Sequence, residues 1–170
     1  MNIFKPRATE RGPQRYYWQA TYNLHAVSLT EKWLSGDDRI VGLTVDHFPQ
    51  VSLVFPSWYL PGVALGPEKF MVWCGTGLHV FNYKAEKFSE LDVRDEIWSA
   101  YYLAGQWCVV CETSVILFDS EPWREIGRFQ HIEVILSNWW ADGLLMLEDF
   151  EGRRLRMKVG PSGFEVVEDR

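Results

Sequence analysis

The sequence predicts an all-β protein with a single domain. Three observations support this prediction: short segments rich in β-branched and aromatic residues dominate the chain, helix-length amphipathic runs are scarce, and apolar segments recur at a fixed spacing. A length of 170 residues suits one domain. Because hydrophobic residues make up 47% and charged residues 24%, intrinsic disorder and low complexity are excluded.

Five segments have the composition of strands and are bounded by turn-forming residues. In chain order they cover residues 51–55, 70–74, 78–81, 107–111 and 115–118. A short turn follows the second and the fourth of them, so the chain is predicted to form successive antiparallel hairpins.

Three other stretches have a different character. Residues 31–34 are the best helix candidate, with Thr30 as the N-cap, and they end at a Ser-Gly-Asp-Asp sequence. Residues 89–98 offer a second helix, with an extended conformation as the competing interpretation. Residues 49–67 contain four of the eight prolines, which predicts an edge strand with surface loops.

An internal repeat carries most of the fold prediction. Placing residue 70 on 107 and 107 on 144 superimposes FMVWCGTGLHVFN, WCVVCETSVILFD and LLMLEDFEGRRLR, an offset of 37 residues. The apolar positions of these segments then coincide. The aligned sets are Val72, Val109 and Met146; Phe81, Phe118 and Leu155; and Cys74 and Cys111.

An aromatic doublet closes each of the first two repeat units, Tyr101-Tyr102 in one and Trp139-Trp140 in the other. Neighbouring residues in a strand point to opposite faces of the sheet. The sheets are therefore predicted to be covered on both faces.

Hairpins that repeat at this spacing and are covered on both faces resemble the blades of propeller-type repeat proteins. The resemblance covers residues 70 to about 167, and the WD40 and kelch signatures are absent from it. It implies one β domain, residues 16–170, with blade-like units near 70–106, 107–143 and 144–170. A β-sandwich, an open curved sheet and a ring completed by a second subunit are the alternatives.

The charge of the chain is unevenly distributed. Of the net charge of −6, the first 15 residues carry +3 and the remainder −9, so residues 1–15 are predicted to be a flexible basic segment. An acidic body repels phosphate backbones, which argues against nucleic-acid binding. The chain has no apolar run of about 18 residues and no signal-peptide pattern, so we expect a cytoplasmic protein without a membrane partner.

The sequence shows no set of residues that predicts catalysis or a cofactor. Cys108 and Cys111 have the spacing of a metal or redox pair, but residues three apart in a strand face opposite sides. We therefore expect three reduced, buried cysteines and no metal. The Gly-Thr-Gly sequence after Cys74 lies where the repeat places a hairpin turn, so a nucleophilic role there is rejected. The four histidines lack metal-binding spacing. We predict no catalytic residue, no cofactor and no enzymatic activity.

Two features predict a binding surface instead. Trp58 and Tyr59 lie in a loop bracketed by prolines, and such rings are common anchors in protein interfaces. Asp92, Asp95 and Glu96 form an acidic cluster that would attract a basic protein partner. These five residues are the predicted partner-binding site.

The function predicted from the sequence is therefore a non-catalytic cytoplasmic protein-binding module. In size and charge it resembles bacterial immunity proteins, whose acidic faces cover the basic active sites of toxins. A carbohydrate-binding or glycosidase-like β domain is the first alternative, because aromatic platforms and carboxylate pairs serve both. A structural subunit of a homo-oligomer, with its aromatic surface buried by self-association, is the second.

Overall fold

The computed structural model describes residues 7–8, 16–22, 25–33, 38–45, 51–56, 61–82, 85, 87–103, 105–120 and 123–167. For residues up to 56 the structure describes the strands and how their backbones pair. The described residues are 73% strand and 0% helix, so the all-β prediction is confirmed. They contain no helix that could span a membrane.

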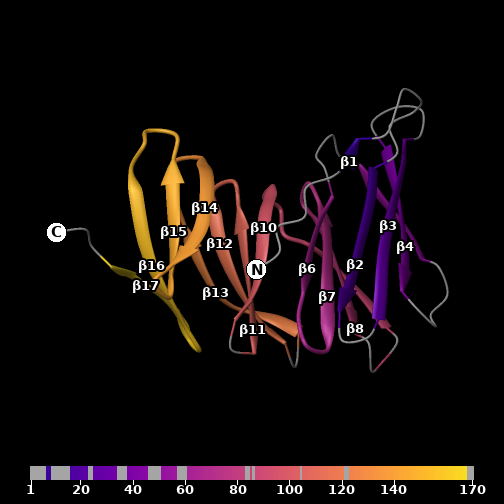
Figure 1. The fold of residues 1–170 in the computed structure, drawn as a ribbon. Coiled ribbons are helices and arrows are strands. Elements are labelled where there is room, and N and C mark those ends of the chain that lie inside the picture. Colours follow the sequence, from indigo (N-terminus) through magenta and orange to yellow (C-terminus); the bar gives the residue numbers. More distant parts are fainter. Residues whose placement is uncertain are drawn as a thin grey trace.

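Four antiparallel sheets follow one another along the described part of the chain (Figure 1). The first contains β1 (Arg7–Ala8), β2 (Tyr16–Tyr22), β3 (His25–Trp33), β4 (Asp38–Val45) and β5 (Val51–Pro56). The second contains β6 (Gly62–Leu65), β7 (Lys69–Cys74), β8 (Gly77–Asn82) and β9 (Lys87–Asp92). The third contains β10 (Ile97–Leu103), β11 (Gln106–Cys111), β12 (Ser114–Ser120) and β13 (Trp123–Gln130). The fourth contains β14 (Ile135–Ala141), β15 (Leu144–Asp149), β16 (Arg154–Gly160) and β17 (Gly163–Val167). Within each sheet the strands lie in sequence order, as successive hairpins require.

Both helix interpretations are wrong, and for residues 89–98 the competing extended interpretation agrees with the strands at each end. Glu31–Trp33 is the end of β3 and pairs with β4, while Leu34 lies outside the described residues. The second candidate divides into the end of β9, a turn with Arg94 at a φ of 58°, and the start of β10. A helix of one or two turns gains few hydrogen bonds for the ordering it requires, whereas these residues gain a partner strand.

The proline-rich stretch behaves as predicted where it is described. β5 is an edge strand of the first sheet and β6 is an edge strand of the second. Edge positions suit proline because one side of the strand needs no donor for a ladder.

The strand pairing shows which residues of successive sheets are equivalent. Phe70 pairs with Phe81, and Trp107 pairs with Phe118, so the second and third sheets are offset by 37 residues as predicted. In the fourth sheet the corresponding buried pair is Leu145 with Met157, at offsets of 38 and 39 residues.

Two predicted alignments in the fourth sheet are therefore wrong. Phe118 corresponds to Met157 rather than Leu155, and Val109 corresponds to Leu147 rather than Met146. The causes are a longer turn between β15 and β16 and one additional residue in β13, where its register on β12 shifts between Leu117 and Phe118. Each of these sheets also begins one strand before the predicted unit, for example with β6 rather than β7 in the second sheet. The predicted repeat length is therefore correct between the second and third sheets, but the unit boundaries are shifted by one strand. The division into a flexible segment, residues 1–15, and one domain stays a prediction.

The third sheet is covered on both faces. Trp107, Val109 and Cys111 of β11 pack in one buried cluster with residues of β7 and β8. Cys108 and Val110 pack in another with residues of β15 and β16. The first aromatic doublet divides in the same way, because Tyr102 contacts the first cluster and Tyr101 the second. This confirms the two-face interpretation of the doublet.

The outer face of the fourth sheet is mixed, because the half-buried Trp139 and Met146 lie on it beside charged residues. Glu148, Arg154 and Arg156 occupy the positions that Val110, Val115 and Leu117 hold in the third sheet. Those three are completely buried, whereas Arg154 is exposed and forms an ion pair with Glu148 at 3.0 Å. Coverage on both faces, predicted for the sheets in general, is thus shown for the third sheet.

Candidate functional site

The structure describes part of the predicted binding site. Trp58 and Tyr59 lie outside the described residues, and Asp92 is described only as the last residue of β9. Asp95 and Glu96 lie together in the connection between β9 and β10. The proposed role of all five in partner binding stays a prediction, and the two that are described have distinct surroundings.

Asp95 holds the neighbouring turn between β11 and β12. Its Oδ2 accepts hydrogen bonds from the backbone N–H of Thr113 at 3.2 Å, the hydroxyl of Thr113 at 3.1 Å and the hydroxyl of Ser114 at 2.7 Å. Ser114 is buried, so its hydroxyl depends on an internal acceptor. These hydrogen bonds give Asp95 a structural role.

Glu96 lies beside other negative charges. Burial raises the pKa of its carboxyl, and repulsion by Glu112 and Asp95 raises it further. The backbone brings the two glutamates together, because the N–H of Glu112 donates to the carbonyl of Glu96 at 2.7 Å. A cation placed here would reduce the repulsion between the carboxylates.

Backbone hydrogen bonds join the connections of the last three sheets into one continuous surface. The connection between β9 and β10 forms backbone hydrogen bonds with residues 75–76 on one side and with Glu112 on the other. The connection between β13 and β14 forms them with residues 112–113 and with Phe150. We name this surface the connecting face and define it as residues 75–76, 93–98, 112–113, 131–136 and 149–153.

Exposed apolar side chains gather on the connecting face. Among the described residues, five large hydrophobic side chains are exposed, and four of them belong to this face. Their exposed fractions are 38% for Trp98, 89% for Ile132, 59% for Leu136 and 71% for Phe150. Three of them, Ile132, Leu136 and Phe150, lie in or beside the connection between the third and fourth sheets. Several large exposed apolar side chains on one face of a protein indicate a contact with another molecule.

Trp98 and Leu136 owe their exposure to equivalent bulges. The register of β10 on β11 shifts between Ile97 and Ser99, and that of β14 on β15 shifts between Ile135 and Ser137. A bulge turns the extra residue away from the regular ladder. The two strands are linked, because Asn138 Oδ1 accepts hydrogen bonds from the hydroxyls of Ser99 and Tyr101.

Phe150 is presented by a turn that Asp149 orders. The buried Asp149 carboxylate accepts hydrogen bonds from the N–H groups of Glu151 at 3.0 Å and Arg153 at 2.9 Å, and from Nε of Arg153 at 2.8 Å. Its Oδ2 also lies 3.0 Å from Nε2 of His131. Burial acts to raise the pKa of Asp149, but these hydrogen bonds and the Arg153 charge outweigh it and lower the pKa to about 2. Phe150 is thus exposed on an ordered turn.

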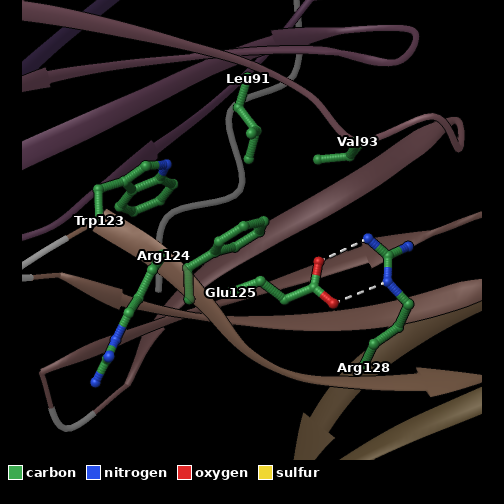
Figure 2. A pocket seen from close by; sticks show the side chains of 7 residues that line it. Leu91, Val93, Trp123, Arg124, Glu125 and Arg128 are labelled. Carbon is green, nitrogen blue, oxygen red and sulfur yellow. Dashed lines mark hydrogen bonds and ion pairs between the residues drawn. The ribbon is translucent and has the colours of Figure 1, made fainter.

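A small pocket lies at the outer edge between the second and third sheets (Figure 2). Phe118 and Trp123 stack in its wall with ring centroids 4.9 Å apart, and Leu91 contributes apolar surface. Its volume is about 110 Å³, which is smaller than typical ligand pockets of about 300 Å³ or more. The one carboxylate in its lining, Glu125, is bound to Arg128 at 2.8 Å, as Figure 2 shows. The pocket therefore lacks the carboxylate pair that the glycosidase alternative requires.

The buried indole nitrogen of Trp123 has no hydrogen-bond partner, which would suggest a ligand in that pocket. Trp107 and Trp140 share this feature. Because both contribute to the packing between sheets, an unpaired indole N–H in this protein does not indicate a ligand site.

The cysteines are buried free thiols, and the two of the Cys-x-x-Cys motif face opposite sheets as predicted. Burial raises the pKa of Cys108 and of Cys111 to about 12. Among the residues that the structure describes, no group of three or more His, Cys, Asp or Glu side chains is arranged to hold a metal ion.

No family model and no curated protein matches this sequence. Solved structures do match its fold. A fragment of HIRA matches with a TM-score of 0.52 at 11% identity, covering 99% of this chain and 58% of that one. The N-terminal domain of Nup159 matches with a TM-score of 0.52 at 11% identity, covering 84% of this chain and 40% of that one. Both are β-propeller proteins. These sheets are blades of the propeller type.

The resemblance to propeller blades predicted from the repeat is thus confirmed at the level of the fold. The dihydro-heme d1 dehydrogenase NirN also matches, with a TM-score of 0.56 at 8% identity over 97% of this chain and 40% of that one. The chain therefore spans about 40 to 58% of the length of these structures. Because one of them is a dehydrogenase, the fold alone does not determine the activity.

Four residues of the connecting face were not predicted from the sequence: Glu112, Ile132, Leu136 and Phe150. A signal was present for Phe150, which is the lone apolar residue within the polar run EDFEGR, whereas Ile132 is followed closely by Val134, Ile135 and Leu136. Leu136 gave no such signal, since exposure there depends on the bulge in β14.

Proposed function

We propose that this chain is a non-catalytic protein-binding domain whose connecting face receives the partner. The observation that carries the proposal is the collection of Trp98, Ile132, Leu136 and Phe150 as exposed side chains on that face. Leaving such groups in water gives up the free energy of burial, about 1.5 to 3 kcal/mol for a large apolar side chain. A partner that covers them recovers part of it.

The order of the connecting face supports the same proposal. Asp149 holds the turn of Phe150, and Asp95 holds the turn that contains Glu112. A surface that is ordered before binding loses little conformational entropy when the partner arrives. Rigid connections that carry exposed apolar side chains therefore favour tight binding.

The two alternatives have less support in the described residues. The pocket beside Trp123 is small and contains one carboxylate, which does not favour action on carbohydrate. The outer face of the fourth blade carries Glu148, Arg154 and Lys158 around the half-buried Trp139 and Met146, so it offers less exposed apolar surface to a second copy than the connecting face offers to a partner. Protein binding through the connecting face is the function we retain.

Neutralisation of a basic toxin is a narrower form of this function. Its support is the small size of the chain and its net negative charge. A cytoplasmic location and a role as an immunity protein stay predictions. Detection of a toxin gene beside the gene for this chain would support them.

Site-specific crosslinking tests the proposal. A photo-crosslinking amino acid is introduced in place of Phe150, and separately in place of Val166, an exposed apolar residue on the edge strand β17. In the native host, we expect one discrete crosslinked protein with the probe at Phe150 and none with the probe at Val166. Equal labelling at both positions, or none at Phe150, would contradict the proposal.

A further inference from the structure

The connecting face has two halves at equivalent positions in neighbouring blades: residues 93–98 and 112–113 form the acidic half, and residues 131–136 and 149–153 form the apolar half. Glu96 and Glu112 lie between the second and third blades, and Val134 and Phe150 take their places between the third and fourth. Both pairs are joined by the same backbone hydrogen bond, at 2.7 Å and 2.9 Å. The same backbone geometry therefore carries charge in one copy and apolar surface in the next.

Negative charge predominates on the connecting face. The face contains six carboxylates and two arginines. One of the arginines, Arg153, is bound to Asp149 at 2.8 Å and to Glu151 at 3.3 Å. The other arginine, Arg94, lies in the acidic half, where it is outnumbered by three carboxylates, Asp95, Glu96 and Glu112. The carboxylates of Glu96 and Glu112 repel one another, so the acidic half favours a further cation.

The two halves together restrict the chemistry of the occupant. Nucleic acids and anionic lipid headgroups carry negative charge and are repelled by the acidic half. A purely apolar surface would cover Ile132 and Phe150 but would bury Glu96 and Glu112 without compensation. An occupant that carries both apolar and cationic side chains satisfies both halves.

We propose that the connecting face binds a cationic segment of another protein, with large apolar side chains against Ile132, Leu136 and Phe150 and a Lys or Arg side chain beside Glu96 and Glu112. This inference rests on the proposed function and specifies the class of its partner. The segment crosses from one blade connection to the next, so its apolar and cationic residues lie close together in its sequence.

Selection from a random peptide library tests the inference while the natural partner is still unidentified. Phage-displayed random dodecapeptides are panned against the full chain, with counter-selection against a variant that carries Ile132→Ser and Phe150→Ser. We expect the enriched peptides to combine Lys or Arg with Leu, Ile or an aromatic residue. Enrichment of neutral or acidic peptides, or no enrichment over the variant, would overturn the inference.

Binding of an enriched peptide then separates the contributions of the two halves. We expect the Ile132→Ser and Phe150→Ser variant to bind at least about tenfold more weakly. The Glu96→Gln and Glu112→Gln variant should bind more weakly at low salt and lose most of its salt dependence. A matched control, Val166→Ser with Glu165→Gln on β17, should bind as the wild type does. Equal losses in all three variants would contradict a site on the connecting face.

Two further outcomes distinguish this inference from the proposed function. If Phe150 crosslinks a protein but selection yields peptides without cationic residues, the function stands and the class of partner is wrong. If the chain sediments with phosphatidylserine vesicles and Phe150→Ser abolishes this, the face binds a membrane and both proposals fail.

Discussion

Phe150 takes the place in the fourth sheet that Glu112 takes in the third. The N–H of each donates to the carbonyl of the residue sixteen positions earlier, Val134 at 2.9 Å and Glu96 at 2.7 Å. One backbone arrangement thus supports two chemically opposite side chains. This relationship indicates that the side chain at this position is free to serve binding, because the fold does not depend on it.

Replacing Phe150 with Glu should therefore leave the fold intact. Because Glu112 occupies the equivalent position and Phe150 is exposed, we expect the free energy of unfolding to change by less than about 0.5 kcal/mol. Urea unfolding followed by circular dichroism measures this. The control is Leu145→Ala in the buried cluster, which should cost about 2 to 5 kcal/mol. A comparable loss with Phe150→Glu would show that the ring belongs to the core.

Replacing Asp95 and replacing its neighbour Glu96 should have opposite effects on the stability of the fold. Asp95→Ala removes the acceptor of Thr113 and Ser114, so unfolding should become about 1 to 3 kcal/mol easier. Glu96→Gln removes a carboxylate whose pKa is raised by burial, Glu112 and Asp95, so the variant should be slightly more stable than the wild type at neutral pH.

The pH dependence of the Glu96 effect follows from the direction of its pKa shift. A raised pKa in the folded state means that ionisation costs stability as the pH rises above the ordinary value of 4.5. The advantage of Glu96→Gln should therefore be present at neutral pH and disappear in acid. Urea titrations at several pH values test this, and an advantage that persists in acid would refute the charge explanation.

Asp149 should make the protein sensitive to strong acid. Its pKa is lowered from an ordinary value of 3.8 to about 2, so its contribution to stability is complete above about pH 4 and is lost as the pH falls towards 2. We expect Asp149→Asn to melt at a lower temperature than the wild type at neutral pH, with the difference shrinking between these two values. A difference that stays constant down to pH 2 would show that hydrogen-bond geometry, rather than charge, determines the effect.

The thiols of Cys108 and Cys111 should be inert in the folded protein. A thiol with a pKa of about 12 is almost entirely protonated at neutral pH, and the thiolate is the reactive form. Maleimide labelling should be slow in buffer and fast in denaturant. Metal analysis of the purified protein complements this measurement. One equivalent of zinc that is lost with Cys108→Ser would contradict our interpretation of the motif.

Local patterns predict much of the fold. The Gly-Thr-Gly sequence after Cys74 predicts a hairpin turn, and β7 and β8 pair across it, with Cys74 opposite Gly77. Alternation also predicts that Cys108 and Cys111 face opposite sheets, as they do. Both follow from the period of a strand, which depends on adjacent residues alone. The helix predicted at residues 31–34 is wrong because pairing with β4 outweighs a weak local preference.

The candidate site depends on relations that no local pattern contains. Of the predicted residues, Asp95 and Glu96 lie on the connecting face, but the sequence did not predict the apolar anchors Ile132, Leu136 and Phe150. Hydrophobicity by itself predicts burial, and Trp107 and Leu145 are indeed completely buried. Whether an apolar residue is buried depends on which segment of the chain packs against it.

The sequence by itself determined the class of this protein: β-strands, tight turns, a third sheet covered on both faces and a repeat of 37 residues between the second and third sheets. Only the tertiary structure decided that the next offset is 38 or 39 residues, that Phe150 corresponds to Glu112, and that four exposed apolar side chains lie on one face. The physical reason is the distance along the chain between the residues that interact. Strand formation and alternation are governed by neighbours along the chain, whereas the end at which a turn emerges and what covers it are governed by packing between sheets.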